Sequence, residues 1–170
     1  RTKNGHYINT VKIGAIEMAK KFWLFKSEPS EFSWDDLKKS TNQTTFWDGI
    51  RNYQARNFLR DEIKKGDGVL FYQSSTEPLA VIGYCEVVKD GYPDHTQFDN
   101  KNDHFDPKAD KKGPTWFMVD IKLVKEFKKP VTLDEIKVNP KLKKMKLIQR
   151  GQRLSIQPVT QAEWDEILKM

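Results

Sequence analysis

The sequence predicts a single α+β domain in which antiparallel strands are flanked by short helices. The chain has 170 residues and a mass of 19.9 kDa, the size of one ordinary domain. It contains 10 Phe, 5 Trp and 5 Tyr, whereas disordered chains are poor in aromatic residues. Segments with strand-like alternation are interspersed with segments of helical spacing, and no low-complexity linker divides them.

Strands are expected where short apolar runs end at turn residues. Such runs lie at residues 22–25, 69–72, 79–88, 116–126 and 154–159, the last being a short strand or a turn. The second and third runs are separated only by the polar segment 73–78, so we expect them to pair as an antiparallel hairpin. The polar segments 40–45 and 90–114 are expected to be loops, the second one unusually long.

Helices are expected where capping signals precede helical spacing. Ser33 and Thr160 each stand three residues before an acidic residue, which is the spacing of a capping box. Thr132 is a third candidate N-cap, and Gly66 is placed to end a helix that contains an apolar face. The expected helices span residues 33–39, 53–64 and 160–169, with a short one after Thr132.

Residues 1–17 are expected to lie outside the domain, as a leader or an expression remnant. They lack the features of a secretory signal, and Met18 followed closely by the first strand resembles a natural start. The domain is therefore expected to span residues 18–170. No run approaches the ~20 apolar residues of a membrane span, so no membrane partner is expected. The net charge of +6 is compatible with a nucleic-acid partner and does not demonstrate one.

Catalytic chemistry finds little support in the sequence. Acidic and histidine side chains crowd one segment, at Asp94, His95, Asp99, Asp103, His104 and Asp106. Their spacing fits neither HExxH nor an EF-hand, so a solvated loop is favoured over a metal site. Cys85 lies in a predicted buried strand, where a thiol is normally inert. With no GxSxG turn and no Gly-rich phosphate loop, we expect no catalytic residue, metal or cofactor.

Trp47 is the tryptophan that lies outside the predicted helices and strands. It leads into the sequence DGIRNYQARN at residues 48–57, which combines an aromatic ring with amides and guanidiniums. These side chains stack on bases and hydrogen-bond to base edges. Amide-rich turns are also common structural features, and composition alone favours a structural loop.

Five motifs occur in an order that resembles the EVE domain family. They are FWLFKSEP at 22–29, WDGIRNYQARN at 47–57, GD at 66–67 with LFY at 70–72, YPD at 92–94, and LSIQP at 154–158. The resemblance covers residues 22–168, and it implies a PUA-like fold: a twisted antiparallel β-barrel flanked by short helices. It also implies kinship with ASCH and YTH domains. The single cysteine favours a reducing, intracellular compartment. We therefore expect a cytoplasmic protein in a prokaryote, with the nucleus as the candidate compartment in a eukaryote.

EVE domains are regarded as readers of modified bases, notably modified cytosines, so the resemblance implies a modified DNA or RNA as the partner. By analogy with YTH domains, it makes Trp47 the main wall of a base cage. Residues at the end of the first strand would face the polar edge of the base: Lys26, Ser27 and Glu28. Residues after Trp47 would line the rim or meet a phosphate: Asn52, Tyr53 and Arg56. Weaker candidates at the pocket mouth are Tyr72, Ser74, Ser155 and Gln157.

A cage wall should be partly exposed, so we expect Trp47 at the bottom of a concave pocket with Ser27 nearby. Two other functions stay open. The first is an ASCH-like amidohydrolase that acts on a modified nucleoside with Lys26 and Glu28 as acid and base, although an ion pair bracing the loop is equally compatible with these residues. The second is an aromatic pocket that binds a peptide. The sequence predicts neither the identity of the base nor the oligomeric state.

Overall fold

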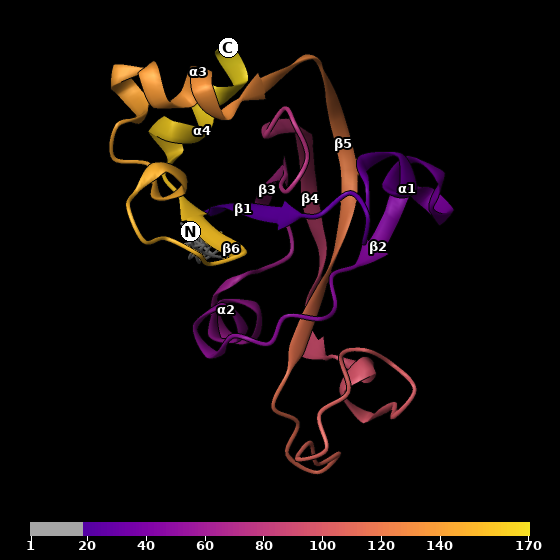
Figure 1. The fold of residues 1–170 in the computed structure, drawn as a ribbon. Helices are drawn as coiled ribbons and strands as arrows, with labels where there is room; N and C mark the ends of the chain where they lie inside the picture. Colours follow the sequence, from indigo (N-terminus) through magenta and orange to yellow (C-terminus); the bar gives the residue numbers. More distant parts are fainter. Residues whose placement is uncertain (1–18) are drawn as a thin grey trace, which may run out of the picture.

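The computed structural model describes residues 19–170, so the predicted domain boundary at Met18 lies outside the described part. One mixed sheet forms its centre (Figure 1), with the strand order β2-β5-β4-β3-β1-β6. The strands are β1 (Phe22–Ser27), β2 (Thr44–Phe46), β3 (Gly68–Gln73), β4 (Ala80–Pro93), β5 (Phe117–Thr132) and β6 (Ile156–Val159). The helices are α1 (Trp34–Lys39), α2 (Tyr53–Asn57), α3 (Leu133–Val138) and α4 (Gln161–Lys169).

The predicted antiparallel core of the sheet is confirmed. β3 pairs antiparallel with β4, and β4 pairs antiparallel with β5. Several register shifts interrupt the β4–β5 pairing, and bulges of this kind bend and twist a pair of strands. β4 and β5, the two longest strands, therefore run the length of the molecule. One end of β5 lies beside α3, and the other end leads from the long loop that follows β4 (Figure 1).

The expectation of a closed, wholly antiparallel barrel is wrong. β1 pairs parallel with β3, from Phe22 opposite Gly68 to Ser27 opposite Gln73. A parallel pair needs a long crossover, which residues 28–67 supply with α1, β2 and α2. The outer strands β2 and β6 are short, and within residues 19–170 they do not pair with each other, so the sheet stays open.

Capping signals located the helices well. Ser33, Thr132 and Thr160 each form a capping box at the start of α1, α3 and α4. The helix expected over 53–64 divides into α2 and a π-helical turn, η2 (Phe58–Glu62). The segment 40–45, expected to be a loop, contains the short 3-10 turn η1 (Thr41–Gln43) and most of β2.

Each face of the sheet carries its own hydrophobic cluster. Trp23 and Phe25 of β1 belong to the cluster beneath Trp47 and α2, whereas Leu24 belongs to the cluster that also contains residues of α3 and α4. This division follows from the alternation of side chains along a strand. Gly83 of β4 permits close packing, because a Cβ there would collide with the Lys125 carbonyl and with the Trp34 ring. The sheet is therefore covered on both faces.

Candidate nucleic-acid interface

The end of β1 brings together several of the predicted site residues. The Ser74 amide and hydroxyl both donate to the Ser27 carbonyl, at 2.9 and 3.2 Å. The Lys26 amide donates to the Ser155 carbonyl at 2.8 Å. The Ser27 hydroxyl donates to the carbonyl of Phe32. Three segments distant in the sequence therefore converge at this point and hold one another through the main chain.

Strand alternation separates the remaining strand candidates from Trp47. Lys26 stands opposite Tyr72 in the β1–β3 register, and Gln157 stands opposite Leu24 in the β1–β6 register. Leu24 and Tyr72 belong to the cluster on the α3–α4 face, while Trp47 belongs to the other cluster. Lys26 and Gln157 thus lie on the opposite face of the sheet from Trp47. The structure does not gather all the predicted residues around one ring.

Trp47 is packed into the core, with 7% of its surface exposed. Its ring lies 5.4 Å from that of Phe25, 5.8 Å from that of Phe71 and 6.1 Å from that of Phe32, measured between centroids. Its amide donates to the Val119 carbonyl at 2.8 Å, which continues the pairing of β2 with β5. The expectation of a partly exposed wall is therefore wrong for this structure, because three aromatic rings cover Trp47.

The exposed aromatic ring among the predicted residues is Tyr53, at 63%. Its ring packs against that of Trp116 with a tilt of 36° and centroids 5.0 Å apart, and the Arg56 guanidinium lies 5.1 Å from its centroid. Arg56 also donates to the Thr115 carbonyl at 2.7 Å. Asn52 caps α2 through a bond from the Ala55 amide at 3.0 Å, so it positions the start of this helix. Asn52, Tyr53 and Arg56 thus form a surface with one exposed aromatic ring and one fixed cation.

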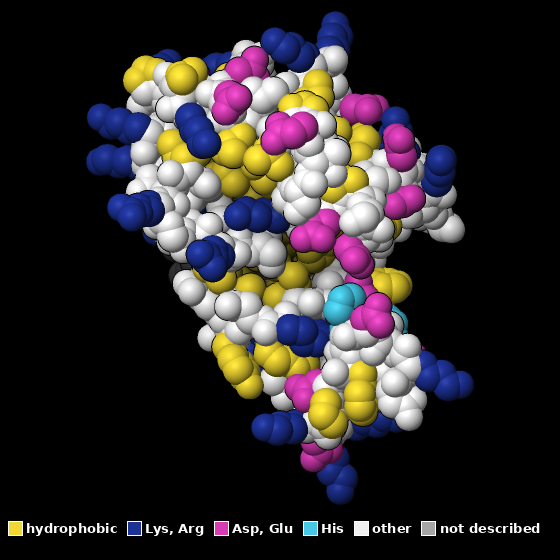
Figure 2. Space-filling view, in the orientation of Figure 1, with side chains coloured by type: hydrophobic (Ala, Val, Ile, Leu, Met, Phe, Trp, Pro, Cys, Tyr) yellow, Lys and Arg dark blue, Asp and Glu magenta, His cyan; other side chains and the backbone are white. Residues whose placement is uncertain are grey.

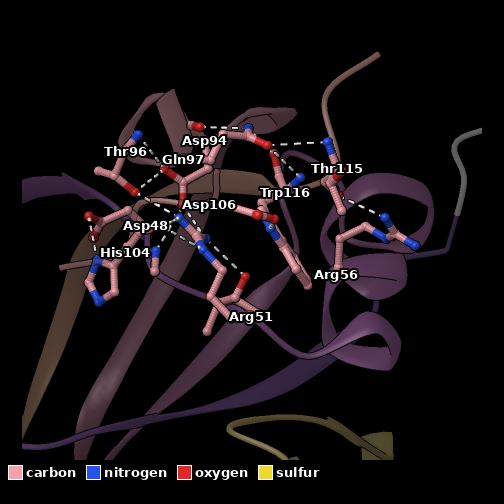
Figure 3. A network of polar contacts seen from close by, with 12 residues as sticks. Asp48, Arg51, Arg56, Asp94, Thr96, Gln97, His104, Asp106, Thr115 and Trp116 are labelled. Atoms are coloured by element: carbon pink, nitrogen blue, oxygen red, sulfur yellow. Dashed lines mark hydrogen bonds and ion pairs between the residues drawn. The ribbon is translucent and has the colours of Figure 1, made fainter. Parts of the chain in front are cut away.

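Arg51 and Asp94 connect the Trp47 segment to the long loop between β4 and β5 (Figure 3). The Asp94 carboxylate is completely buried and accepts from the Gly49 amide at 2.8 Å, from the Arg51 guanidinium at 2.9 Å and from the Thr96 amide at 2.8 Å. Arg51 also donates to the His104 carbonyl at 2.7 and 3.0 Å. Two segments that are far apart in sequence are therefore fixed to each other by charged and main-chain groups.

The environment of Asp94 stabilises its ionised form. Burial alone raises the pKa of this carboxyl, but hydrogen bonds from Thr96, Gly49 and Arg51 outweigh burial and leave the pKa below its usual range. Gln97 is also fully buried, and its side chain bonds to the main chain of Asp94, Thr115 and Trp116. The expected solvated loop is thus an ordered structure at its base. Within residues 19–170 no group of acidic, histidine or cysteine side chains is arranged to hold a metal.

The turn that follows Trp47 requires a glycine at position 49 for two reasons. Its φ is +79°, a conformation that favours glycine, and a Cβ would lie 2.5 Å from Cε1 of His104. The His104 Nδ1 in turn lies 3.8 Å from the Asp48 carboxylate. The imidazole is therefore packed directly against the turn that follows Trp47.

Figure 2 shows a hollow across the middle of one face. In the matching ribbon view, the end of β1 lies above this hollow, and the segment leading from β2 into α2 lies below it. Two other concavities, of about 600 and 310 Å3, lie beside residues 20–23 and 61–67, and neither is lined by Trp47. The end of β1 and the segment that leads from β2 into α2 thus border an open depression.

The predicted acid–base pair is not assembled. Within the described residues, Lys26 and Glu28 form no ion pair with each other. Glu28 is exposed and accepts a bond from the Ser75 hydroxyl at 3.4 Å. Burial lowers the pKa of Lys26 below its ordinary value, which is a desolvation effect without a charged partner. No helix among residues 19–170 has the length and apolar content needed to cross a membrane.

The sequence and the fold of this chain both match proteins that are already known. The EVE domain model matches residues 21–170, and the chain belongs to the EVE domain family. It is 46% identical over 165 residues to thymocyte nuclear protein 1 of Gallus gallus, covering 87% of this chain and 67% of the relative. A hypothetical protein from Leishmania major has a TM-score of 0.83 at 45% identity, over 89% of this chain and 94% of that chain.

One similar structure contains a ligand. The human THYN1 protein in complex with DNA containing 5-methylcytosine has a TM-score of 0.83 at 44% identity, over 88% of this chain and 96% of that chain. An ASCH protein from Zymomonas mobilis is 12% identical with a TM-score of 0.52, which is a likeness of fold alone. The resemblance to the EVE family inferred from five motifs is confirmed.

Proposed function

We propose that this chain is a non-catalytic module that recognises 5-methylcytosine in DNA, with the base extruded from the helix into the hollow beside the end of β1. The observation that carries the proposal is the 44% identity and 0.83 TM-score with the human THYN1 protein in its complex with 5-methylcytosine DNA. The similarity extends over almost the whole described part of the chain, so it includes the segments that surround the hollow.

The residues around the hollow supply the two kinds of contact that an extruded base needs. The segments that converge at the end of β1 carry the hydroxyls of Ser27, Ser74 and Ser155, which suit the polar edge of a base. Tyr53 and Arg56 offer an exposed ring and a cation at the rim. Stacking of this kind is worth about 1–3 kcal/mol per base, which offsets an extrusion cost of a few kcal/mol.

Other predicted residues act in this proposal by support rather than contact. Trp47 holds the floor of the site through its packing on Phe25 and Phe71. Glu28 braces the loop after β1 through Ser75. Burying one methyl group contributes about 0.8 kcal/mol, or about a fourfold preference for the methylated base. The proposed reader therefore discriminates modestly and depends on the rest of the DNA for most of its affinity.

The competing function is hydrolysis of a modified cytidine. An amidohydrolase needs a base within hydrogen-bond reach of the attacking group and a donor for the oxyanion. The separation of Lys26 from Glu28 argues against this arrangement, and the likeness to the ASCH protein is one of fold alone.

The test measures turnover and affinity on the same preparation. The protein is incubated with acylated, methylated and hydroxymethylated cytidines, and products are measured by chromatography. Binding of a short duplex containing 5-methylcytosine is measured by fluorescence anisotropy. The proposal predicts saturable binding without product, largely retained in Glu28→Gln and weakened in Tyr53→Ala. Turnover of any cytidine that disappears in Lys26→Ala would overturn it.

A further inference from the structure

The segment 137–153 concentrates positive charge to a degree that the rest of the chain does not share. It contains no Asp or Glu, and its basic residues are Lys137, Lys141, Lys143, Lys144, Lys146, Arg150 and Arg153. These seven charges exceed the net +6 of the whole chain, which leaves −1 for all other residues together. Without this segment, the remaining residues would carry a slight net negative charge.

These basic side chains are available to a partner. All seven residues are exposed. Of these seven, only Lys141 has a carboxylate of residues 19–170 within ion-pair distance, namely Glu166 at 3.8 Å. Figure 2 shows Lys and Arg along the left margin of the hollowed face, where Figure 1 places segment 137–153, and Asp and Glu mainly toward the right. The hollow thus has one strongly basic side.

The segment is a fixed scaffold. It contains the 3-10 turns η4 (Pro140–Leu142) and η5 (Lys146–Ile148). Its Leu142 and Met145 are buried in the hydrophobic cluster on the α3–α4 face of the sheet. The Gln149 side-chain amide donates to the Lys143 carbonyl at 3.1 Å, which ties the two turns together. A preformed arrangement of cations needs little backbone ordering when it meets an anionic partner.

The segment leads directly to the proposed base site. Arg153 is followed by Leu154 and Ser155, and the Ser155 carbonyl accepts from the Lys26 amide at 2.8 Å. A chain of cations therefore ends at the point where β1 meets the hollow. A DNA base extruded into the hollow leaves the flanking phosphates at its margins, and the basic margin is the side with complementary charge.

We propose that segment 137–153 is the surface that holds the phosphate backbone of duplex DNA next to the base being read. This inference rests on the proposed function and adds the position and the chemistry of the backbone contacts. Contacts to phosphates position a duplex and increase affinity without reading its sequence. The segment therefore sets the affinity for any duplex, while the residues around the hollow set the preference for the modified base.

The test is the salt dependence of duplex binding. The variant combines Lys143→Gln, Lys144→Gln, Lys146→Gln and Arg150→Gln, and its matched control combines Lys101→Gln, Lys108→Gln, Lys111→Gln and Lys112→Gln in the loop between β4 and β5. All eight residues are exposed, and thermal melting verifies that both variants fold. The affinities for two duplexes that differ only in one 5-methylcytosine are measured over a range of salt concentrations.

The inference predicts that the segment variant weakens both duplexes by the same factor, roughly tenfold or more, while the loop control changes little. The slope of log affinity against log salt should become shallower by about 0.9 for each phosphate that the variant no longer neutralises. The pair Lys143→Gln and Lys144→Gln alone should give about half of the change. A matching slope in variant, control and wild type would overturn the inference. The same three proteins are also titrated with single-stranded DNA and with anionic vesicles, and a loss confined to either of these would overturn it as well.

The two proposals fail in different ways. If the wild type shows no preference for 5-methylcytosine but the segment variant still has a shallower slope, the base assignment fails and the backbone surface stands. If the preference persists and the slope is unchanged in the segment variant, the backbone surface fails alone.

Discussion

Removing the Asp94 carboxylate should destabilise the protein and loosen the segment that follows Trp47. Asp94→Ala deprives the Gly49 amide, the Thr96 amide and the Arg51 guanidinium of their shared acceptor. Breaking a buried charge pair by removing one partner costs about 3–5 kcal/mol. Arg51 retains its bonds to His104 and is partly exposed, so we expect the lower end of that range, about 3 kcal/mol.

The effect should be visible by heat and by pH. For a domain of this size, 1 kcal/mol shifts Tm by about 2–4 °C, so Asp94→Ala should melt about 6–12 °C lower at pH 7. Because the pKa of Asp94 is lowered by folding, its contribution is complete above the unfolded value of about 3.9 and disappears as the pH falls through the folded value. The difference in free energy of unfolding between wild type and variant should therefore be constant from pH 7 to 5 and shrink below pH 4.

Asp103→Ala is the matched control, because Asp103 is an exposed carboxylate in the same loop with no hydrogen-bond partner in the described structure. It should change stability by less than about 0.5 kcal/mol. Chemical denaturation measures both variants. An Asp94→Ala protein within 1 kcal/mol of wild type would refute the reasoning about this network. A destabilised Asp94→Ala protein that still binds 5-methylcytosine DNA with wild-type affinity at low temperature would separate the network from the binding site.

Three further substitutions test neighbouring features. Trp47→Ala should lower the free energy of unfolding by about 3–5 kcal/mol, as expected for a core tryptophan, and a decrease below 1 kcal/mol in denaturant titration would contradict its packing. Tyr53→Ala should leave Tm nearly unchanged and weaken DNA binding by about fivefold or more, whereas Phe46→Ala, an exposed ring on β2, should not weaken binding. Gly49→Ala should cost about 1–3 kcal/mol through strain and the collision with His104, and an unchanged Tm would show that the turn adapts.

Local signals in the sequence predicted much of the secondary structure. Ser33 and Thr160 predict the starts of their helices, because each N-cap and its acidic partner lie within four residues of each other in the sequence. The β3–β4 hairpin was equally accessible, since a short polar connection between two apolar runs permits little other than antiparallel pairing.

Features that depend on distant segments were not predictable in the same way. The parallel pairing of β1 with β3 requires a crossover through residues 28–67, and nothing in either strand encodes it. The three residues of β2 become a strand only because β5 lies beside them. Whether the sheet closes depends on the reach of its two outer strands, which the pattern of apolar residues does not record.

The candidate site shows the same limit. Trp47 is conspicuous in the sequence, but its burial depends on Phe25, Phe32 and Phe71, which come from separate segments. Asp94 and Thr96 have the spacing of a local Asx turn, which was a readable signal. Arg51, which pairs with Asp94, lies 43 residues away in the sequence, so the network between the two segments could not be predicted from local spacing.

The affinity ratio between a duplex containing one 5-methylcytosine and the same duplex with cytosine tests the central claim most directly. Fluorescence anisotropy at a fixed salt concentration gives both dissociation constants on one preparation of the full chain. Burial of a single methyl group predicts a ratio of about four, and at most about ten, in favour of the methylated duplex. Equal affinities for the two duplexes, or tighter binding of the unmodified one, would contradict the assignment of this chain as a reader of 5-methylcytosine.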